Sequence, residues 1–152
     1  MIVIEGHGEI IIEREPQEIL DFVLDLERYR EADTKIGRIR SFERHDNSGT
    51  VRYRGKLRGL PTPTDTQTFE LVPGRSLTFR SADSLWPGMV ARFEGRFECE
   101  PVDEGTRLVH RERFTFRGPG RFLAEPFLRS WLAADTTQEM NRLKEQLEAD
   151  SR

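Results

Sequence analysis

The spacing of apolar residues changes along the chain, from a period of two over most of its length to a helical period near the end. Between Gly120 and Asp150 the apolar side chains recur mainly three or four residues apart, which predicts one long amphipathic helix. These side chains are Phe122, Leu123, Phe127, Leu128, Trp131, Leu132, Met140, Leu143 and Leu147. A stripe of this length must be covered, so we expect it to lie on the apolar face of a sheet.

The residues before this helix predict about seven strands and one or two short helices. Residues 2–14 alternate as a strand, and Pro16 opens a helical pattern that ends near Tyr29. Residues 30–37 form a connection or a second short helix. The other strands are expected at residues 38–42, 51–58, 66–71, 77–81, 89–100 and 106–117, joined as hairpins.

Two stretches between these strands are expected to be loops. Pro61 and Pro63 cannot donate a backbone hydrogen bond to a neighbouring strand, which predicts a loop over residues 59–64. The segment around Trp86 carries Pro and Gly and is also expected as a loop. Ile39 and Phe42 disagree in parity, which predicts a bulge beside Arg40 and favours an outward Arg40 side chain over an inward one.

Sequential hairpins indicate an antiparallel meander, with the first strand added at one edge. The expected fold class is therefore α+β. In this helix-grip arrangement, a curved antiparallel sheet of about seven strands wraps a long C-terminal helix. Residues 1–152 contain no linker or repeat and are expected to form a single domain.

Composition narrows the classes of partner. A formal net charge of −3 is too small to favour nucleic acid, and no apolar run approaches the roughly 18 residues of a membrane span. Cys99 is the only cysteine, which excludes an intrachain disulfide. The first residues lack the pattern of a secretory signal, so a cytoplasmic location is expected. The oligomeric state stays open.

The hairpin of residues 89–117 places polar side chains on an apolar face. Its turn pairs Phe97 with His110 and Gly95 with Glu112, so His110 and Glu112 are predicted to point inward. The pair could act as general acid and base on a polarised ketone or enol. It could instead orient a ligand, or form a satisfied polar pair bonded to itself, to Tyr53 or to water. The residues alone leave these three interpretations open.

The other candidate ligand contacts follow from the predicted inner faces. Tyr53 is an inward phenol on the central strands, which could bind a ligand or simply pack. The apolar residues expected to line a cavity between sheet and helix are Leu57, Phe69, Phe79, Phe93, Phe97, Phe114, Leu128 and Trp131. A solid core would also account for these rings.

No metal site or cofactor is expected. His7, His45 and His110 are scattered along the chain, without a cysteine partner or the spacing of known metal motifs. No glycine-rich loop precedes a helix in the way that phosphate binding requires. His7 and His45 are expected on the surface.

Several segments together resemble the polyketide cyclase/dehydratase and lipid-transport branch of the START-like (SRPBCC) superfamily, which shares its fold with the birch-pollen allergen. They are residues 10–13, 16–19, 22–29, 72–74, 104–107 and 143–148. The chain departs from many members at residues 31–34, where they have an aromatic residue soon after the first helix.

The resemblance implies a cavity between the sheet and the final helix for a hydrophobic or aromatic small molecule. Binding, as carriage or sequestration, is the function we expect. One alternative is a cyclase- or dehydratase-like enzyme without metal, using His110 and Glu112 as acid and base. The other is a protein-interaction module whose cavity is filled by side chains.

Overall fold

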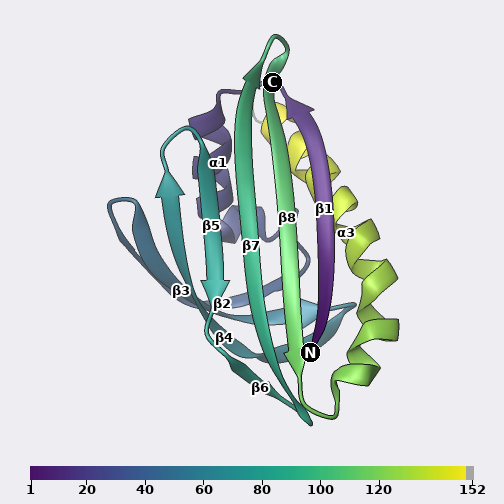
Figure 1. The fold of residues 1–152 in the computed structure, drawn as a ribbon. Helices are drawn as coiled ribbons and strands as arrows, with labels where there is room; N and C mark the ends of the chain where they lie inside the picture. The colour runs from purple at the N-terminus through teal and green to yellow at the C-terminus, as the bar shows by residue number, and fades with distance from the viewer. Residues whose placement is uncertain (150–152) are drawn as a thin grey trace.

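The computed structural model describes residues 1–149 as one curved antiparallel sheet with helices packed against it (Figure 1). In chain order its elements are β1 (Ile2–Ile12), α1 (Pro16–Leu24), α2 (Leu26–Tyr29), β2 (Ile36–His45), β3 (Ser48–Leu57), β4 (Leu60–Val72), β5 (Ser76–Ser81), β6 (Ser84–Trp86), β7 (Met89–Val102), β8 (Gly105–Arg117) and α3 (Arg121–Ala149). The strand order is β1-β8-β7-β5-β4-β3-β2, and β6 pairs with β7. The predicted helix-grip fold, with the first strand at one edge, is confirmed.

Pro16 begins α1, as the sequence predicts, because its fixed φ suits the first helical position. The helix does not run unbroken to Tyr29. It ends at Leu24, the Asp25 N–H bonds the carbonyls of Asp21 and Phe22, and α2 follows as a single turn. This break leads the chain into the connection of residues 30–35, which delivers Asp33 and Lys35 to the interior.

The long final helix is confirmed up to Ala149, while Asp150 lies outside the described residues. The single continuous apolar stripe is wrong at the start of the helix. Ala124, Leu128 and Leu132 face the sheet at intervals of four. Phe122 and Leu123 lie on a different face of the helix and are 63% and 76% exposed.

Glycines on β1 allow α3 to pack unusually close to the sheet. A Cβ on Gly6 would lie 2.2 Å from Thr136 Oγ1, and one on Gly8 would lie 2.8 Å from the Thr136 carbonyl oxygen. Any larger residue would push the helix away. This close approach places the middle of α3, with Asp135 and Glu139, beside the inner face of the sheet.

The predicted pairing of β7 with β8 is confirmed residue by residue. Phe97 lies opposite His110, and Gly95 lies opposite Glu112. His110 and Glu112 are each 2% exposed. The predicted inward orientation of both side chains is therefore correct.

Two predicted loops are wrong. Residues 60–64 belong to β4, which joins β3 through a tight turn at Arg58 and Gly59, both with positive φ. Pro61 and Pro63 are accommodated because β5 pairs only with the later part of β4. The Trp86 segment forms the short strand β6, which raises the count over residues 1–149 to eight strands.

The predicted bulge in β2 is confirmed by register shifts on both sides of Ile39, and Arg40 is exposed. His7 and His45 lie on the surface, as expected. Among residues 1–149, no helix has both the length and the apolar character that crossing a bilayer requires.

Candidate functional site

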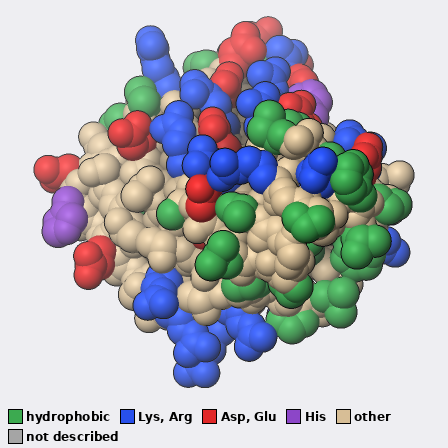
Figure 2. Space-filling model, turned by 60° about the horizontal axis from the view of Figure 1, so that its bottom comes forward, with side chains coloured by type: hydrophobic (Ala, Val, Ile, Leu, Met, Phe, Trp, Pro, Cys, Tyr) green, Lys and Arg blue, Asp and Glu red, His purple; other side chains and the backbone are tan. Residues whose placement is uncertain are grey.

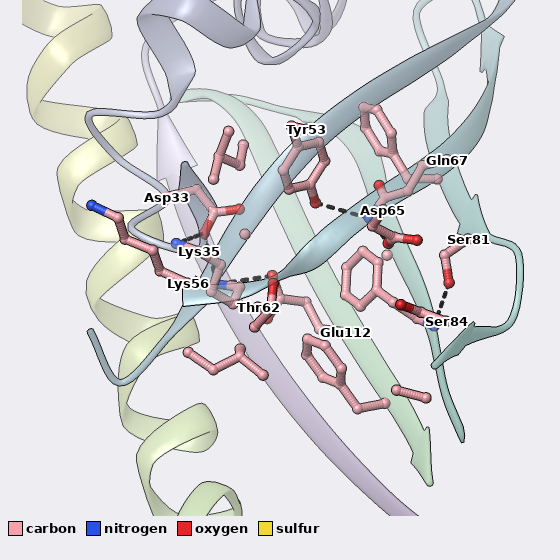
Figure 3. A pocket seen from close by; sticks show the side chains of 18 of the residues that line it. Asp33, Lys35, Tyr53, Lys56, Thr62, Asp65, Gln67, Ser81, Ser84 and Glu112 are labelled. Carbon is pink, nitrogen blue, oxygen red and sulfur yellow. Dashed lines mark hydrogen bonds and ion pairs between the residues drawn. The ribbon is translucent and has the colours of Figure 1, made fainter. Parts of the chain in front are cut away.

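A cavity opens between the inner face of the sheet and the α1–α2 region, with a volume of about 70 Å³ (Figure 3). One wall is aromatic and consists of Phe79, Phe93, Phe97 and Phe114. The Phe93 and Phe114 rings pack with centroids 4.8 Å apart, and Phe79 meets Phe97 edge to face. Strand β6 borders the opening through Ser84 and Trp86.

The structure brings together eight of the eleven residues predicted to contact a ligand. The residues that line the cavity are Tyr53, Leu57, Phe79, Phe93, Phe97, His110, Glu112 and Phe114. The other three lie elsewhere. Phe69 packs between Phe42 and Phe79, Leu128 belongs to the core beneath the start of α3, and Trp131 is half-buried on α3. No residue of α3 lines the cavity, because the helix packs mainly against β1, at the edge of the sheet.

The polar end of the cavity is built around Lys35, which is 6% exposed. Its Nζ lies 2.8 Å from Asp33 Oδ1, 2.9 Å from Asp135 Oδ2, 2.9 Å from Glu139 Oε1 and 3.2 Å from Glu112 Oε1. Burial alone would lower the pKa of Lys35, but the surrounding carboxylates outweigh it and raise this pKa well above its ordinary value. We call these five residues, together with His110, the lysine network.

His110 is held by acceptors on both ring nitrogens. Nδ1 lies 3.1 Å from the Arg96 carbonyl oxygen, while Nε2 lies 2.9 Å from Glu112 Oε1 and 3.1 Å from Glu139 Oε2. A carbonyl and two carboxylates can only accept, so both nitrogens carry protons and the ring is an imidazolium. Burial would lower the pKa of His110, but Glu139 and Glu112 raise it to about 10. His110 therefore has no free nitrogen with which to accept a proton at neutral pH.

Glu139 and Tyr29 complete the buried side of the network. The Tyr29 hydroxyl donates to Glu139 Oε2. Burial would raise the pKa of Glu139, but Lys35 and His110 hold it well below its usual range. Burial and the adjacent Glu139 raise the pKa of Tyr29. Tyr29 therefore stays protonated and acts as a hydrogen-bond donor.

The charges of the network nearly cancel. Four carboxyl groups face three positive charges, because Arg142 joins Lys35 and His110 by pairing with Asp135. The balance is reached when one carboxyl is protonated. Burial, and then Glu139, raise the pKa of Asp33 to about 7, so Asp33 is the carboxyl that exchanges a proton near neutral pH.

A second polar group lies across the cavity on β3 and β4 and consists of Tyr53, Asp65 and Gln67, which we call the Tyr53 group. Gln67 Nε2 donates to the Tyr53 hydroxyl at 2.8 Å and to Asp65 Oδ2 at 3.1 Å. Burial, followed by Asp33 and Asp65, raises the pKa of Tyr53. No described residue accepts the Tyr53 proton, and Figure 3 shows this hydroxyl beside the cavity.

Two sets of three side chains bring potential metal-ligand atoms within 4.8 Å of one another. They are His110, Glu112 and Glu139, and Asp33, Asp135 and Glu139. The ammonium group of Lys35 already lies among these oxygens and supplies the positive charge, and His110 offers no lone pair. The Lys35 ammonium group therefore occupies the position that a metal ion would need.

Sequence reasoning predicted Glu112 but missed Lys35 and the other three acids around it, Asp33, Asp135 and Glu139. Asp33 and Lys35 lie in a connection, where the Lys35 N–H bonds Asp33 Oδ1 in a local turn that orients both side chains. Asp135 and Glu139 fall in the interval between Leu132 and Met140, where the apolar stripe of α3 is interrupted. This interruption was the signal that could have revealed them, because 135 and 139 lie one turn apart on the same face.

The chain was compared with known families and structures. Residues 4–148 match the family model described as polyketide cyclase / dehydrase and lipid transport. No curated protein sequence matches the chain. An aromatase/cyclase from a Streptomyces species has a similar fold, at a TM-score of 0.75 and 15% identity over 99% of this chain and 97% of that one.

Two further solved structures have the same fold. A protein from Thermus thermophilus gives a TM-score of 0.75 at 18% identity, over 97% of this chain and 99% of that one. The protein Ara h 8.0201 gives a TM-score of 0.61 at 12% identity, over 97% of each chain. At such identities the structural matches establish the fold and do not identify a ligand.

Proposed function

Because the chain belongs to the polyketide cyclase / dehydrase and lipid transport family, we propose that it binds a hydrophobic or aromatic small molecule in the cavity between sheet and helices. The observation that carries this proposal is the aromatic wall of Phe79, Phe93, Phe97 and Phe114, which faces space instead of closing into a solid core. Ring faces of this kind pack against planar apolar ligands.

The two polar groups support a ligand with polar ends. The lysine network lies at one end of the cavity and the Tyr53 group lies across from it (Figure 3). A few placed polar groups in an apolar pocket are the arrangement that orients a bound molecule. The interaction-module alternative needed a cavity filled by side chains, and it finds no support in this cavity.

The test is native mass spectrometry of the protein purified gently from its own host, followed by extraction of any bound compound. A matched pair of variants on β6 locates the binding. Ser84 lines the cavity, whereas its neighbour Leu85 is 80% exposed. Ser84→Trp should fill the opening and abolish the bound mass, while Leu85→Trp should retain it. The proposal would be contradicted if the purified protein carried no compound from its host and also took up no added aromatic compound.

A cyclase- or dehydratase-like activity is the second candidate, favoured by one observation. Asp33, with a pKa of about 7, and the Tyr53 hydroxyl both line the cavity. Such a carboxyl could move a proton to or from an enolisable ketone. In this version Asp33 takes the role of acid and base, Glu112 pairs with Lys35, and His110 holds Glu112 in place. Turnover of a polyketide-type substrate that is lost in Asp33→Asn, with binding retained, would support it.

A further inference from the structure

The ionisable groups that line the cavity are unequal in what they can offer a ligand. The acids are Asp33, Asp65 and Glu112, and the buried cations are Lys35 and His110. An anionic ligand would need one of these cations, whereas a ligand with a hydrogen-bond donor would need a free acceptor. The hydrogen bonds show which of the two the cavity can supply.

Lys35 has no hydrogen left for a ligand. An ammonium group carries three N–H donors, and four carboxylate oxygens already lie within 2.8–3.2 Å of Lys35 Nζ. A bound anion would have to displace one of these carboxylates and leave it buried without its partner. Such an unpaired buried charge is strongly unfavourable.

The remaining cations near the cavity are also engaged or directed away. Both N–H groups of His110 are held by protein oxygens. At the opening, Arg92 pairs with Asp83 at 2.8 Å. Lys56 is exposed, and its side chain extends away from the cavity (Figure 3). Within the described residues, no buried positive charge is free to meet a ligand carboxylate.

Asp33 and Tyr53 do offer a ligand a free acceptor and a free donor. Asp33 makes its contacts to the Lys35 N–H and Nζ through Oδ1 alone, which leaves Oδ2 available. The Tyr53 hydroxyl has a proton that no described residue accepts. Both residues line the same cavity, and Figure 3 shows the Asp33 carboxyl on the side that faces Tyr53. A ligand could donate to Asp33 and accept from Tyr53.

We propose that this cavity selects uncharged aromatic ligands that carry a hydrogen-bond donor beside an acceptor, and that it excludes carboxylates. This selectivity rests on the proposed binding function and specifies its ligand class. An anion would lose its hydration in the cavity without gaining an ion pair, because both buried cations are already held by carboxylates.

The test uses 2-naphthamide and 2-naphthoate, which have nearly the same shape and differ in charge at neutral pH. Each is titrated into the protein while backbone amide NMR shifts are followed. Shifts at residues of the cavity separate binding there from binding on the exposed apolar side chains at the end of the molecule that carries β6 and the start of α3 (Figure 2). We expect 2-naphthamide to bind in the cavity at least about tenfold more tightly than 2-naphthoate.

The double variant Asp33→Asn/Asp65→Asn removes two cavity acids without changing their shape. It should strengthen 2-naphthoate binding at least about threefold and change 2-naphthamide binding less. The control, Asp21→Asn/Asp103→Asn, removes the same charge from two exposed positions outside the cavity and should change neither affinity.

The outcomes separate the two proposals. Cavity binding of both ligands with equal affinity, unaltered in Asp33→Asn/Asp65→Asn, would overturn the charge selectivity and leave the binding function standing. Equal gains of 2-naphthoate affinity in both double variants would also overturn it, because net charge would then be the cause. Absence of cavity shifts with either ligand would overturn the binding function, and the selectivity with it.

Discussion

The lysine network and the Tyr53 group face the same cavity, yet they differ in whether their hydrogen-bond donors are used up. In the lysine network every cation is surrounded by acceptors, and His110 has both nitrogens engaged. In the Tyr53 group a hydroxyl keeps a proton that no described residue accepts. The groups of the network have strongly shifted pKa values, yet it is the Tyr53 group that has a free donor with which to bind a ligand.

The comparison shows that burial and a shifted pKa do not by themselves mark a chemical site. Structural ion networks shift pKa values as strongly as catalytic sites do. A group that acts on a ligand must also have a free donor or acceptor on the side where the ligand binds. By this criterion Asp33 and Tyr53 qualify, and His110 does not.

The largest expected effect comes from removing the centre of the network. Lys35→Met should lower the free energy of unfolding by about 3–5 kcal/mol, because it leaves buried carboxylates without their cation. The matched control is Lys56→Met, which alters an exposed lysine and should change stability by less than about 0.5 kcal/mol. Urea unfolding at pH 7 measures both. Similar losses in the two variants would mean that the network is not a structural element.

The second prediction concerns the imidazolium of His110 and its pH dependence. Folding raises the pKa of His110 from 6.5 to about 10. Its contribution to stability is therefore complete below pH 6.5 and is lost as the pH rises toward 10, by up to about 1.4 kcal/mol per pH unit. The stability advantage of the wild type over His110→Gln should shrink across this range. Ring ¹⁵N shifts at pH 8 should show an imidazolium, and a neutral ring would contradict the assignment.

The third prediction concerns the Asp33 carboxyl, and its pH trend has the same sign as that of His110. Folding raises the pKa of the Asp33 carboxyl from 3.8 to about 7, so this group favours the folded state most at low pH and less as the pH rises through that window. Asn cannot ionise. The stability of Asp33→Asn relative to the wild type should therefore increase between pH 4 and pH 8, by up to about 1.4 kcal/mol per pH unit. Asp103→Asn, at an exposed turn, should show no such trend.

Much of the fold could be predicted because its signals are local or periodic. The alternation along residues 89–117 determined the pairing of His110 with Phe97, and the parity conflict at Ile39 indicated the bulge. The error at Pro61 has a physical origin, since a proline is excluded from a ladder only where a neighbouring strand needs its N–H. Beyond the end of β5 that requirement disappears.

The site was only partly predictable because its centre is assembled from distant segments. Lys35 and Glu139 are 104 residues apart, and no periodicity connects a lysine in a connection to an acid in a helix. The sequence predicted His110 and Glu112 as an inward pair, but Lys35 and Glu139, which join them, could not be identified until the chain was folded. The one local indication of the network was the departure from the family pattern at residues 31–34, because this segment contains Asp33.

The smallest expected change in stability comes from the last prediction, which tests the comparison with one tyrosine from each side. Tyr53→Phe removes a hydroxyl that only accepts a neutral hydrogen bond from Gln67, so stability should fall by less than about 1 kcal/mol. Tyr29→Phe removes a donor to the buried Glu139 carboxylate, a hydrogen bond to a charged group, and should cost about 1.5–3 kcal/mol.

The losses of ligand affinity in these two variants should follow the opposite order to their losses of stability. Tyr53→Phe should weaken 2-naphthamide binding about five- to tenfold, because the ligand loses the donor that Tyr53 supplies, while Tyr29→Phe should leave the affinity within about twofold. Unfolding and NMR titrations on the same two proteins measure both quantities. If Tyr53→Phe lost stability and kept its affinity, the Tyr53 group would be as structural as the lysine network. The recognition of the ligand would then have to rest on the aromatic wall alone.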